Sequence, residues 1–369
     1  MEAQSGWFHI YNEDEVLSPS VLIYPDRVRE NIRKMLVIAD GPHRLRPHVK
    51  THKLPQIVRF QLKEGLTRFK CATLSELEMT AGSGGEDVLL AYSLIGPAVD
   101  RFLGLMIAHP DVRMSLLTDS LVACQQIERK AEARDMPVTL YLDINNGMGR
   151  TGITPGQEAF DLYKYIRESN SLAAGGLHIY DGHIHTRDFH ERKAECDRAF
   201  ASVAELIKNL ESAGMDIPEI VCGGTPTFPV HALYEERMLS PGTSLLWDYG
   251  YGTSFPDLNF LHAAVLFTRV ISKPGPNTIC LDLGHKAVAS EKPHPRVWFP
   301  EMEEYTPVNH SEEHLTVTGD AAARYSVGDC LYGIPTHICP TMALHEQVYV
   351  VRDRRVIGKW TVTARSRLY

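Results

Sequence analysis

The sequence predicts an α/β protein that consists of a (β/α)8 barrel and an additional, mostly antiparallel β domain toward the C-terminal end. Two observations favour the barrel. Eight short apolar or β-branched runs alternate with helical patterns between residues 45 and 240, and no GxGxxG motif follows an early strand, which weakens the alternative of an open dinucleotide-binding sheet. The β domain is predicted by short β-like runs separated by Gly, Pro and Asp after about residue 260.

The eight expected strands are short and regularly spaced, and they cover 45–50, 68–72, 87–92, 112–117, 138–143, 173–180, 219–223 and 236–240. Apolar residues at helical spacing predict helices over 55–65, 121–135, 160–170 and 190–214, of which the first and last end at Gly65 and Gly214. Alternating strands and helices are typical of a parallel sheet.

The second region is predicted to contain β-strands within 263–272, 277–284, 296–300, 314–319, 347–353 and 355–362. We therefore expect a barrel over 20–260 and a β domain formed by 1–19 plus 261–369. The VLIYP run near residue 21 precedes the eight barrel runs, and we expect it to pair with the second domain.

Composition excludes several classes of protein. The 369 residues are 44% hydrophobic and 23% charged, and their net charge of −8 argues against a nucleic-acid or anionic-membrane binder. No stretch approaches the roughly 20 apolar residues of a membrane span, and the acidic N-terminus does not resemble a secretory signal, so we expect a cytoplasmic protein. The seven cysteines form no CxxC pair and do not indicate a disulfide framework.

Lys50 is the first residue to which the barrel would assign chemistry, because it ends the first expected strand in RPHVKTHK. Barrel enzymes carry their active sites at the C-terminal ends of the strands. A partly desolvated lysine has a lowered pKa and can attack a carbonyl. The alternative is a surface lysine in a basic loop.

Two turns after the last expected strands, CGGTPT and SPGTS, contain Gly223, Gly224, Thr225, Gly242 and Thr243. Loops after strands 7 and 8 of such barrels often bind phosphate, and glycine turns let backbone N–H groups approach an anion. The alternative is two tight turns without a ligand. A lysine opposite a phosphate-binding turn indicates pyridoxal 5′-phosphate held as a Schiff base.

Three further residues would lie near this cofactor. Arg150 in DINNGMGRTG could reach the phenolate side of the ring, or pair with Asp143 instead. Tyr180 in HIYDGHIH could pack on the cofactor, or be a tyrosine of the barrel core. His185, just past the sixth strand, is interpreted as an acid/base group rather than as half of a His183-x-His185 metal pair.

The best metal-ligand candidates are His337 and Cys339 in PTHICPT, two positions apart on an expected strand or extended loop. Alternate residues of a strand point the same way, and imidazole with thiolate favours zinc. A buried cysteine with a structural histidine is the alternative. Asp282, Lys286, Glu313 and His314 lie near turns of the second domain, and we assign them no role beyond solvated or structural ion pairs.

The motifs together resemble the D-threonine aldolase and D-serine dehydratase family, whose members are fold type III pyridoxal-phosphate enzymes with an alanine-racemase-like barrel. The resemblance runs from about residue 15 to 365 and rests, in chain order, on RPHVKTHK, CATLSELE, GRTG, CGGTPT, SPGTS, LDLGHKA, SEEH and PTHICPT.

The resemblance implies a role for each matching residue. Lys50, and not Lys53, would carry the cofactor, and Arg150 and Tyr180 would contact its ring, with Thr73 as a further contact. Gly223, Gly224, Thr225, Gly242 and Thr243 would hold the phosphate. His337 and Cys339 would hold the divalent metal that binds the substrate's β-hydroxyl, with zinc preferred over manganese or magnesium. The protein would be a homodimer that acts on D-amino acids.

The resemblance leaves the reaction open. Family aldolases typically have Asp at the second metal position and dehydratases have Cys, so Cys339 favours dehydration to a 2-keto acid and ammonia. The YDGHIH segment with His185 favours retro-aldol cleavage of β-hydroxy-D-amino acids to glycine and an aldehyde, which we take as the first expectation. An amino-acid racemase and a non-catalytic pyridoxal-phosphate-binding protein remain as further alternatives.

Overall fold

The structure is a computed structural model that describes residues 6–302 and 304–367. It contains two compact units. One consists mainly of Lys34–Lys50 and Pro55–Gly242, and the other of the residues up to Arg33, Thr51–Leu54 and Thr243–Arg365. Within the described ranges, no helix combines the length and the apolar character that crossing a bilayer requires.

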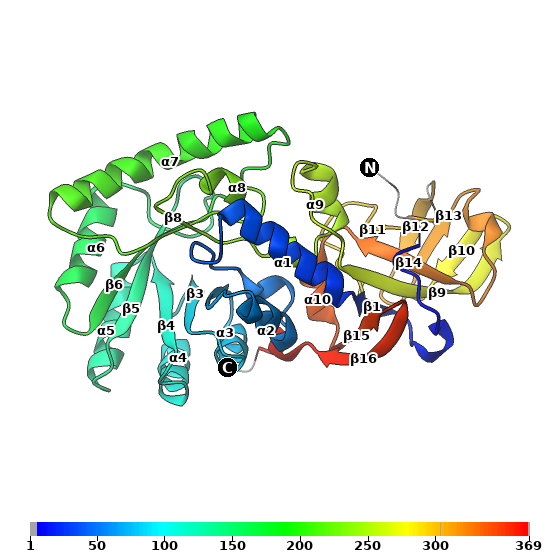
Figure 1. The fold of residues 1–369 in the computed structure, drawn as a ribbon, viewed down its shortest axis with the longest axis horizontal. Helices are drawn as coiled ribbons and strands as arrows, with labels where there is room; N and C mark the ends of the chain where they lie inside the picture. The colour runs from blue at the N-terminus through cyan, green and yellow to red at the C-terminus, as the bar shows by residue number, and fades with distance from the viewer. Residues whose placement is uncertain (1–5, 303, 368–369) are drawn as a thin grey trace. The chain divides into compact units, whose positions relative to one another are not determined.

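The first unit is an α/β barrel. Its described residues form a parallel seven-stranded sheet in which sequence order and spatial order coincide (Figure 1), made of β2 (Arg68–Cys71), β3 (Asp87–Ser93), β4 (Arg113–Thr118), β5 (Val138–Ile144), β6 (Leu172–Ile179), β7 (Ile220–Cys222) and β8 (Arg237–Leu239). These strands confirm seven of the eight expected runs.

Helices connect successive strands of the barrel and lie outside the sheet (Figure 1). They are α2 (Pro55–Lys63), α3 (Leu74–Gly82), α4 (Pro97–Ala108), α5 (Leu121–Glu132), α6 (Gln157–Glu168), α7 (Phe189–Ser212) and the short α8 (Phe228–His231). The four helices expected from apolar spacing are therefore confirmed, with bounds that differ by at most three residues.

The first expected strand, 45–50, is reduced to a closing segment, residues 45–48, that joins the two end strands of the sheet. Leu45 forms a parallel bridge with Leu239 of β8, and His48 forms one with Lys70 of β2. Pro47 accepts a hydrogen bond from the Lys70 amide but has no N–H to donate, which limits this segment to isolated bridges.

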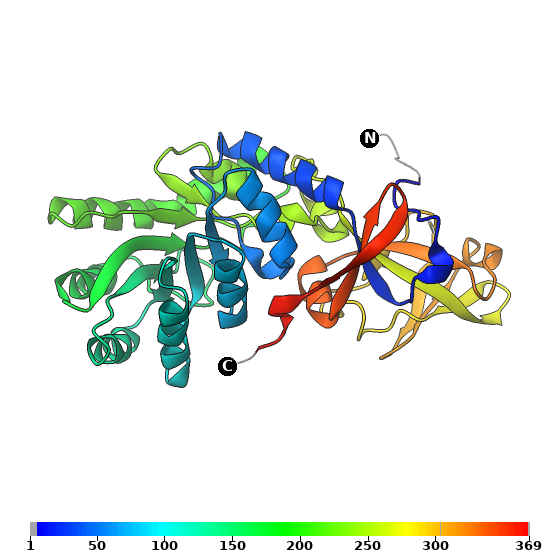
Figure 2. The ribbon, with the colours of Figure 1, turned by 60° about the horizontal axis from the view of Figure 1, so that its bottom comes forward.

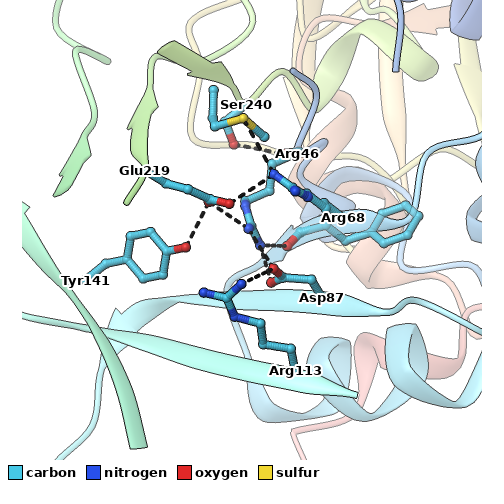
Figure 3. A network of polar contacts seen from close by, with 9 residues as sticks. Arg46, Arg68, Asp87, Arg113, Tyr141, Glu219 and Ser240 are labelled. Atoms are coloured by element: carbon cyan, nitrogen blue, oxygen red, sulfur yellow. Dashed lines mark hydrogen bonds and ion pairs between the residues drawn. The ribbon is translucent and has the colours of Figure 1, made fainter. Parts of the chain in front are cut away.

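The N-terminal end of the barrel interior is filled by a closed polar network (Figure 3). Arg46, fully buried, donates to both carboxylate oxygens of Asp87 at 2.7 and 3.1 Å and to Glu219 at 2.9 Å. Glu219 also accepts from Arg68 at 3.0 Å and from the Tyr141 hydroxyl at 2.8 Å. Burial opposes the charge of Arg46, but the Asp87 carboxylate raises the pKa of Arg46 above its usual value. An apolar layer lies next in the interior and is formed by Leu89, Leu117, Tyr141, Val221 and Met238.

The second unit is built on a mostly antiparallel sheet, as predicted. The described strands follow the order β12-β13-β10-β9-β1-β15-β16, and β14 pairs with both β9 and β11. Their bounds are β1 (Ser20–Ile23), β9 (Ala264–Gly275), β10 (Thr278–Leu281), β11 (Val297–Trp298), β12 (Thr306–His310), β13 (Leu315–Thr318), β14 (Cys330–Pro335), β15 (Gln347–Arg352) and β16 (Arg355–Thr361). Strands β12 and β14 lack a clear alternating pattern and were not expected.

The VLIYP run pairs with this sheet, as expected. It forms β1, which lies antiparallel to β9 and parallel to β15 (Figure 2). Helix α1 (Pro25–Ala39) follows it, and two short helices, α9 (Tyr249–Ser254) and α10 (Ile338–Leu344), belong to later parts of the chain. The core of the second unit joins residues from both chain ends, including Phe8, Leu22, Phe267, Tyr332 and Val351.

Candidate cofactor site and metal-ligand pair

Lys50 lies where the closing segment of the barrel ends, in the single 3₁₀ turn Val49–Thr51. Its side chain is partly buried, and its Nζ lies 5.7 Å from the centre of the Tyr180 ring. The backbone N–H of Lys50 donates to His48 Nδ1 at 3.3 Å, which ties the turn to the bridge with β2. The lysine thus lies at the C-terminal end of the barrel, where such folds carry their active sites.

Among the described residues, three cationic side chains approach the ring of Tyr180. The Nζ atoms of Lys50 and Lys70 lie 5.7 and 5.9 Å from its centre, and the guanidinium carbon of Arg150 lies 4.9 Å from it. Distances below about 6 Å are within the range of cation–π attraction. The charges of Lys50 and Arg150, and that of Lys70 when it is protonated, repel one another, so this end of the barrel favours an anionic ligand.

Tyr180 follows β6, and two glycines fix its ring. A Cβ atom at Gly182 would lie 2.3 Å from the ring, and one at Gly224 would lie 2.9 Å from it. Both distances are shorter than side-chain contacts allow, so the ring packs directly on glycine backbone. Tyr180 is only partly buried, which does not agree with the alternative interpretation of this residue as a tyrosine of the barrel core.

A chain of buried polar groups lies behind the cations. The Lys70 Nζ is 3.4 Å from His178 Nε2, and His178 Nδ1 is 2.7 Å from Asp143 Oδ1. Thr151 donates to the other oxygen of Asp143 at 2.9 Å. Burial opposes ionisation of Asp143, but the hydrogen bond from His178 holds the pKa of Asp143 below its usual value. Asp143 therefore pairs with His178 and Thr151, whereas Arg150 lies over Tyr180.

The turn after β7 has the glycine requirement that the sequence suggested. Gly223 has a φ of +73°, and a Cβ atom there would lie 2.7 Å from His231 Cδ2 and 2.9 Å from Thr227 Oγ1. The Thr225 hydroxyl, in the same turn, accepts from the Gly242 amide at 3.0 Å. The expected phosphate residues Gly223, Gly224, Thr225 and Gly242 therefore share one place in the barrel unit.

A relay of hydrogen bonds supports this turn from behind. Arg237 can only donate, so His231 accepts at Nδ1, 3.0 Å away, and carries its proton on Nε2. That proton is donated to Asp181, 2.7 Å away. Asp181 also accepts from Thr227 at 2.6 Å, and Thr227 accepts from the Gly224 amide at 3.2 Å.

The same relay contains a group of potential metal ligands. Asp181, Cys196 and His231 are all buried and are the described residues whose ligand atoms cluster within 4.8 Å of one another. The Nε2 atom of His231 is already committed to Asp181, and the burial of Cys196 raises the pKa of its thiol. We therefore interpret this cluster as support for the glycine turn.

The remaining expected cofactor residues occupy separate places. Thr73 follows β2 and caps α3, where its hydroxyl accepts from the Glu76 amide at 3.2 Å. His185 is exposed in the loop between β6 and α7. Thr243 begins the 3₁₀ turn Thr243–Leu245 directly after Gly242 and is assigned to the second unit.

The expected extended conformation of the HxC pair holds for His337 but is wrong for Cys339. His337 is the N-cap residue of α10, and Cys339 lies in the first turn of that helix. The helix begins there because the buried carboxylate of Asp248 accepts a hydrogen bond from the Ile338 amide at 3.0 Å. The ICPTMAL segment that follows has no alternating pattern, and the sequence argument from strand geometry missed the helix start.

The side chains of His337 and Cys339 nevertheless interact. Burial alone would lower the pKa of His337, but its interactions with Cys339, Glu291 and Asp248 raise this pKa to about 9. His337 Nδ1 is hydrogen-bonded to Glu291, and the Cys339 Sγ lies 3.1 Å from Thr51 Oγ1 and 3.4 Å from Thr243 Oγ1. A histidine whose Nδ1 contacts a carboxylate presents Nε2, which is the usual arrangement of a metal-ligating imidazole.

The other charged residues of the second unit form ordinary pairs. Lys286 contacts Glu312 at 2.7 Å and Glu313 at 3.0 Å, and all three are exposed. Asp282 accepts from the Thr268 hydroxyl at 2.6 Å and from the Arg269 amide at 2.9 Å. The backbone oxygen of His314 closes a turn with the Ser311 amide. These contacts agree with a structural or solvated role.

Sequence reasoning missed Lys70, His178, Asp181 and His231. Two of them carried a usable signal: Lys70 lies between the buried Phe69 and Cys71 within a strand, and His178 lies between Leu177 and Ile179. A polar residue in the middle of a buried strand requires a partner inside the barrel. The partners come from other strands, so the sequence alone could not identify them.

Comparison with known proteins agrees with this geometry. The model of the alanine racemase N-terminal domain matches residues 23–250, and that of a putative serine dehydratase domain matches 263–351. A D-threonine aldolase of Arthrobacter sp is 28% identical over 95% of this chain and 93% of its own length. A 3-hydroxy-D-aspartate aldolase of Paracoccus denitrificans is 28% identical over 97% and 94%.

A solved structure shares the whole fold. The crystal structure of the D-threonine aldolase from Filomicrobium marinum superimposes with a TM-score of 0.89 at 27% identity, covering 97% of this chain and 98% of that one. The barrel and the following β unit thus have counterparts over nearly the full length. The chain belongs to the alanine racemase N-terminal domain family, within its D-threonine aldolase and D-serine dehydratase group of pyridoxal-phosphate lyases.

Proposed function

We propose that this protein is a pyridoxal-phosphate- and divalent-metal-dependent lyase that cleaves β-hydroxy-D-amino acids into glycine and an aldehyde. The observation that carries the proposal is the convergence of Lys50, Lys70 and Arg150 on the ring of Tyr180. A planar ligand with several negative charges would stack on that ring and neutralise the cations around it.

The residues of the barrel fit this cofactor. The turn at Gly223 and Gly224 leaves no room for a Cβ atom, as expected where backbone must approach a phosphate closely. Thr225 and Gly242 lie beside it, and with Thr243 they would hold the phosphate. Lys50 would hold the cofactor's aldehyde carbon, and when bound the cofactor would supply an electron sink for negative charge at the substrate's Cα.

The chain's own groups would then orient the substrate and move its protons. Tyr180 and Arg150 would fix the cofactor ring, with Thr73 as a further contact. His185 would accept the proton of the substrate's β-hydroxyl in the cleavage reaction. Its exposure in the β6–α7 loop leaves it accessible for this role.

We assign the metal to His337 and Cys339. Imidazole and thiol are the ligands that zinc prefers, and the Glu291 contact at Nδ1 supports ligation through Nε2. A divalent ion there would supply a Lewis acid for the β-hydroxyl. We further propose that the cofactor-binding part expected at 20–260 corresponds to the unit of Lys34–Lys50 and Pro55–Gly242. The part expected at 1–19 with 261–369 would carry the metal pair, and it also takes in β1 and residues 243–260.

Elimination of water from the same substrates is the second candidate. It is favoured by Cys339, since a cysteine at this metal position resembles the dehydratases, and by the match of 263–351 to a putative serine dehydratase domain. In that reaction the amine of Lys50 would remove the Cα proton, and the products would be a 2-keto acid and ammonia.

The decisive experiment is product identification. The protein, supplied with pyridoxal phosphate and Zn²⁺ or Mn²⁺, is incubated with D-threonine, 3-hydroxy-D-aspartate and D-serine, with L-threonine as a control. Glycine and an aldehyde support the aldolase, and a keto acid with ammonia supports the dehydratase. Formation of the opposite enantiomer alone would show a racemase and contradict both.

Chelation tests the metal separately. Dialysis against a strong chelator should remove lyase activity while the visible absorbance of the bound cofactor persists, and added Zn²⁺ should restore the activity. Activity that survives complete removal of metal would contradict the assignment of His337 and Cys339. We also propose a homodimer, which light scattering after size-exclusion chromatography would test.

A further inference from the structure

Lys70 is a buried amine to which the proposed reaction assigns no step of its own. It lies on β2 with 2% of its surface exposed, and its Nζ faces the ring of Tyr180 from 5.9 Å. The nearest proton acceptor in the described part of the chain is His178 Nε2 at 3.4 Å, which is long for a hydrogen bond to an ammonium group.

The protonation of its partner can be derived from the contacts. The carboxylate of Asp143 only accepts, so His178 carries a proton on Nδ1, which lies 2.7 Å away. Burial and the charge of Lys70 lower the pKa of His178, which keeps the ring neutral and leaves Nε2 as an acceptor. One weak acceptor therefore serves an ammonium group that has three protons to donate.

The charges around Lys70 do not compensate for this. The groups that face it are the cation of Lys50, the carboxylates of Asp143 and Asp181, the thiol of Cys222, the imidazole of His178 and the ring of Tyr180. Asp143 is paired with His178 and Asp181 with His231. Burial, with the like charge of Lys50, lowers the pKa of Lys70 to about 7.

We propose that Lys70 binds an anionic oxygen of the ligand that lies against Tyr180, and that it takes up a proton when that ligand binds. The inference rests on the proposed function, because it assumes a ligand joined to Lys50. An oxygen anion beside Nζ would supply the acceptors that the barrel lacks and would stabilise the ammonium form. The oxygen could belong to the cofactor's phenolate or to the carboxylate of the amino-acid substrate.

Proton uptake can be counted by titration calorimetry at pH 8 in two buffers with different ionisation enthalpies. The first step adds pyridoxal phosphate to the cofactor-free protein, and the second adds a D-amino acid to the loaded, metal-free protein. Wild type is compared with Lys70→Met, which removes the amine, and with Lys70→Arg, which keeps a permanent charge.

We expect both variants to take up about half to one proton fewer than wild type in one of the two steps, because neither can gain a proton at this position. In that step the affinity of Lys70→Met should fall by roughly tenfold or more, and Lys70→Arg should lose less. A difference in the first step identifies the cofactor as the source of the anion, and a difference in the second identifies the substrate.

Equal proton counts for wild type and Lys70→Arg in both steps would overturn the proposal, even if Lys70→Met fails to fold. Failure of the proposed function has a different signature. In that case wild type itself would bind pyridoxal phosphate without a visible absorbance that depends on Lys50, and this result would overturn the proposed function together with the inference that rests on it.

Discussion

The two ends of the barrel interior differ in the groups that surround their charged side chains. At the N-terminal end, Arg46 lies between the carboxylates of Asp87 and Glu219, at distances of 2.7 to 3.1 Å (Figure 3). At the C-terminal end, the cations of Lys50, Lys70 and Arg150 surround Tyr180. At the first end the charge of Arg46 is paired with carboxylates of the protein itself, whereas at the second end positively charged groups gather around an aromatic ring.

This difference separates stability from function along one barrel. Conservation of polar groups at the bottom of such barrels serves stability, and residues at the top serve chemistry. The charges give the physical basis. At the N-terminal end, two carboxylates lie around the buried Arg46. The two carboxylates that face Lys70 are already engaged by His178 and His231. Variants at the two ends should therefore have opposite effects on folding and on binding.

Lys50→Ala should have the largest effect. We expect complete loss of the cofactor's visible absorbance and of lyase activity, because Lys50 is the only lysine proposed to hold the aldehyde. Lys53→Ala is the matched control from the same motif and should keep both. A Lys50→Ala protein that is yellow and can be reduced by borohydride would contradict the assignment.

Arg46→Met should destabilise the protein by about 3–5 kcal/mol, since it removes the fully buried cation that lies between the carboxylates of Asp87 and Glu219. Urea unfolding measures the loss. Arg113→Met is the control: Arg113 lies 3.8 Å from Asp87 and its side chain is 53% exposed, so its removal should cost less than about 1 kcal/mol. Similar losses for the two variants would show that the network is not a buried one.

Lys70→Met should act in the opposite sense and stabilise the cofactor-free protein by about 3–4 kcal/mol at pH 7. The pKa of Lys70 is lowered from 10.5 to about 7, so the unfolded chain binds one more proton between these values. The stability that this group contributes is complete above pH 10.5 and is lost as the pH falls to about 7, with a slope near 1 kcal/mol per pH unit.

That slope should be present in wild type and absent in Lys70→Met when urea unfolding is repeated between pH 7 and 9. Arg46→Met should keep the slope of wild type. A destabilised Lys70→Met protein would mean that the barrel, and not a ligand, satisfies this amine.

Thr227→Val should have the smallest effect. It removes one hydroxyl from the relay behind the glycine turn, and we expect a loss of about 1 kcal/mol in stability with roughly tenfold weaker binding of pyridoxal phosphate. Tyr141→Phe removes one hydroxyl from the network at the other end, 2.8 Å from Glu219, and should cost similar stability without weakening cofactor binding. Equal binding losses would contradict the separation of the two ends.

Sequence reasoning predicted the barrel because its signals are local. Strand and helix periods, Gly65 and Gly214 at helix ends, and the turns after strands 7 and 8 are all readable within a few residues. The strand assignment failed at 45–48, where Pro47 interrupts the hydrogen bonds between strands. It also failed for the pair of His337 and Cys339, because a helix begins between them at Ile338, whose amide donates to the distant carboxylate of Asp248.

The candidate site could be predicted only in part, and the reason is again sequence distance. Lys50, Arg150, Tyr180 and the glycine turns stand in motifs of their own. The contact partner of Lys70 is His178, which is 108 positions away, and that of Asp181 is His231, which is 50 positions away. Partners brought together by strand order leave no local pattern.

The bridges of the closing segment have one more consequence. Backbone hydrogen bonds from Arg46 to Leu239 and from His48 to Pro241, each 2.8 Å long, complete the ring on one side, and Lys50 follows two residues later. A molecule that is attached to Lys50 and bound by the turns after β7 and β8 would cross-link the closing segment, residues 45–48, to the end of the sheet. Opening of the barrel at this place would then require release of the cofactor. The urea concentration at the midpoint of unfolding should therefore rise with the concentration of free pyridoxal phosphate.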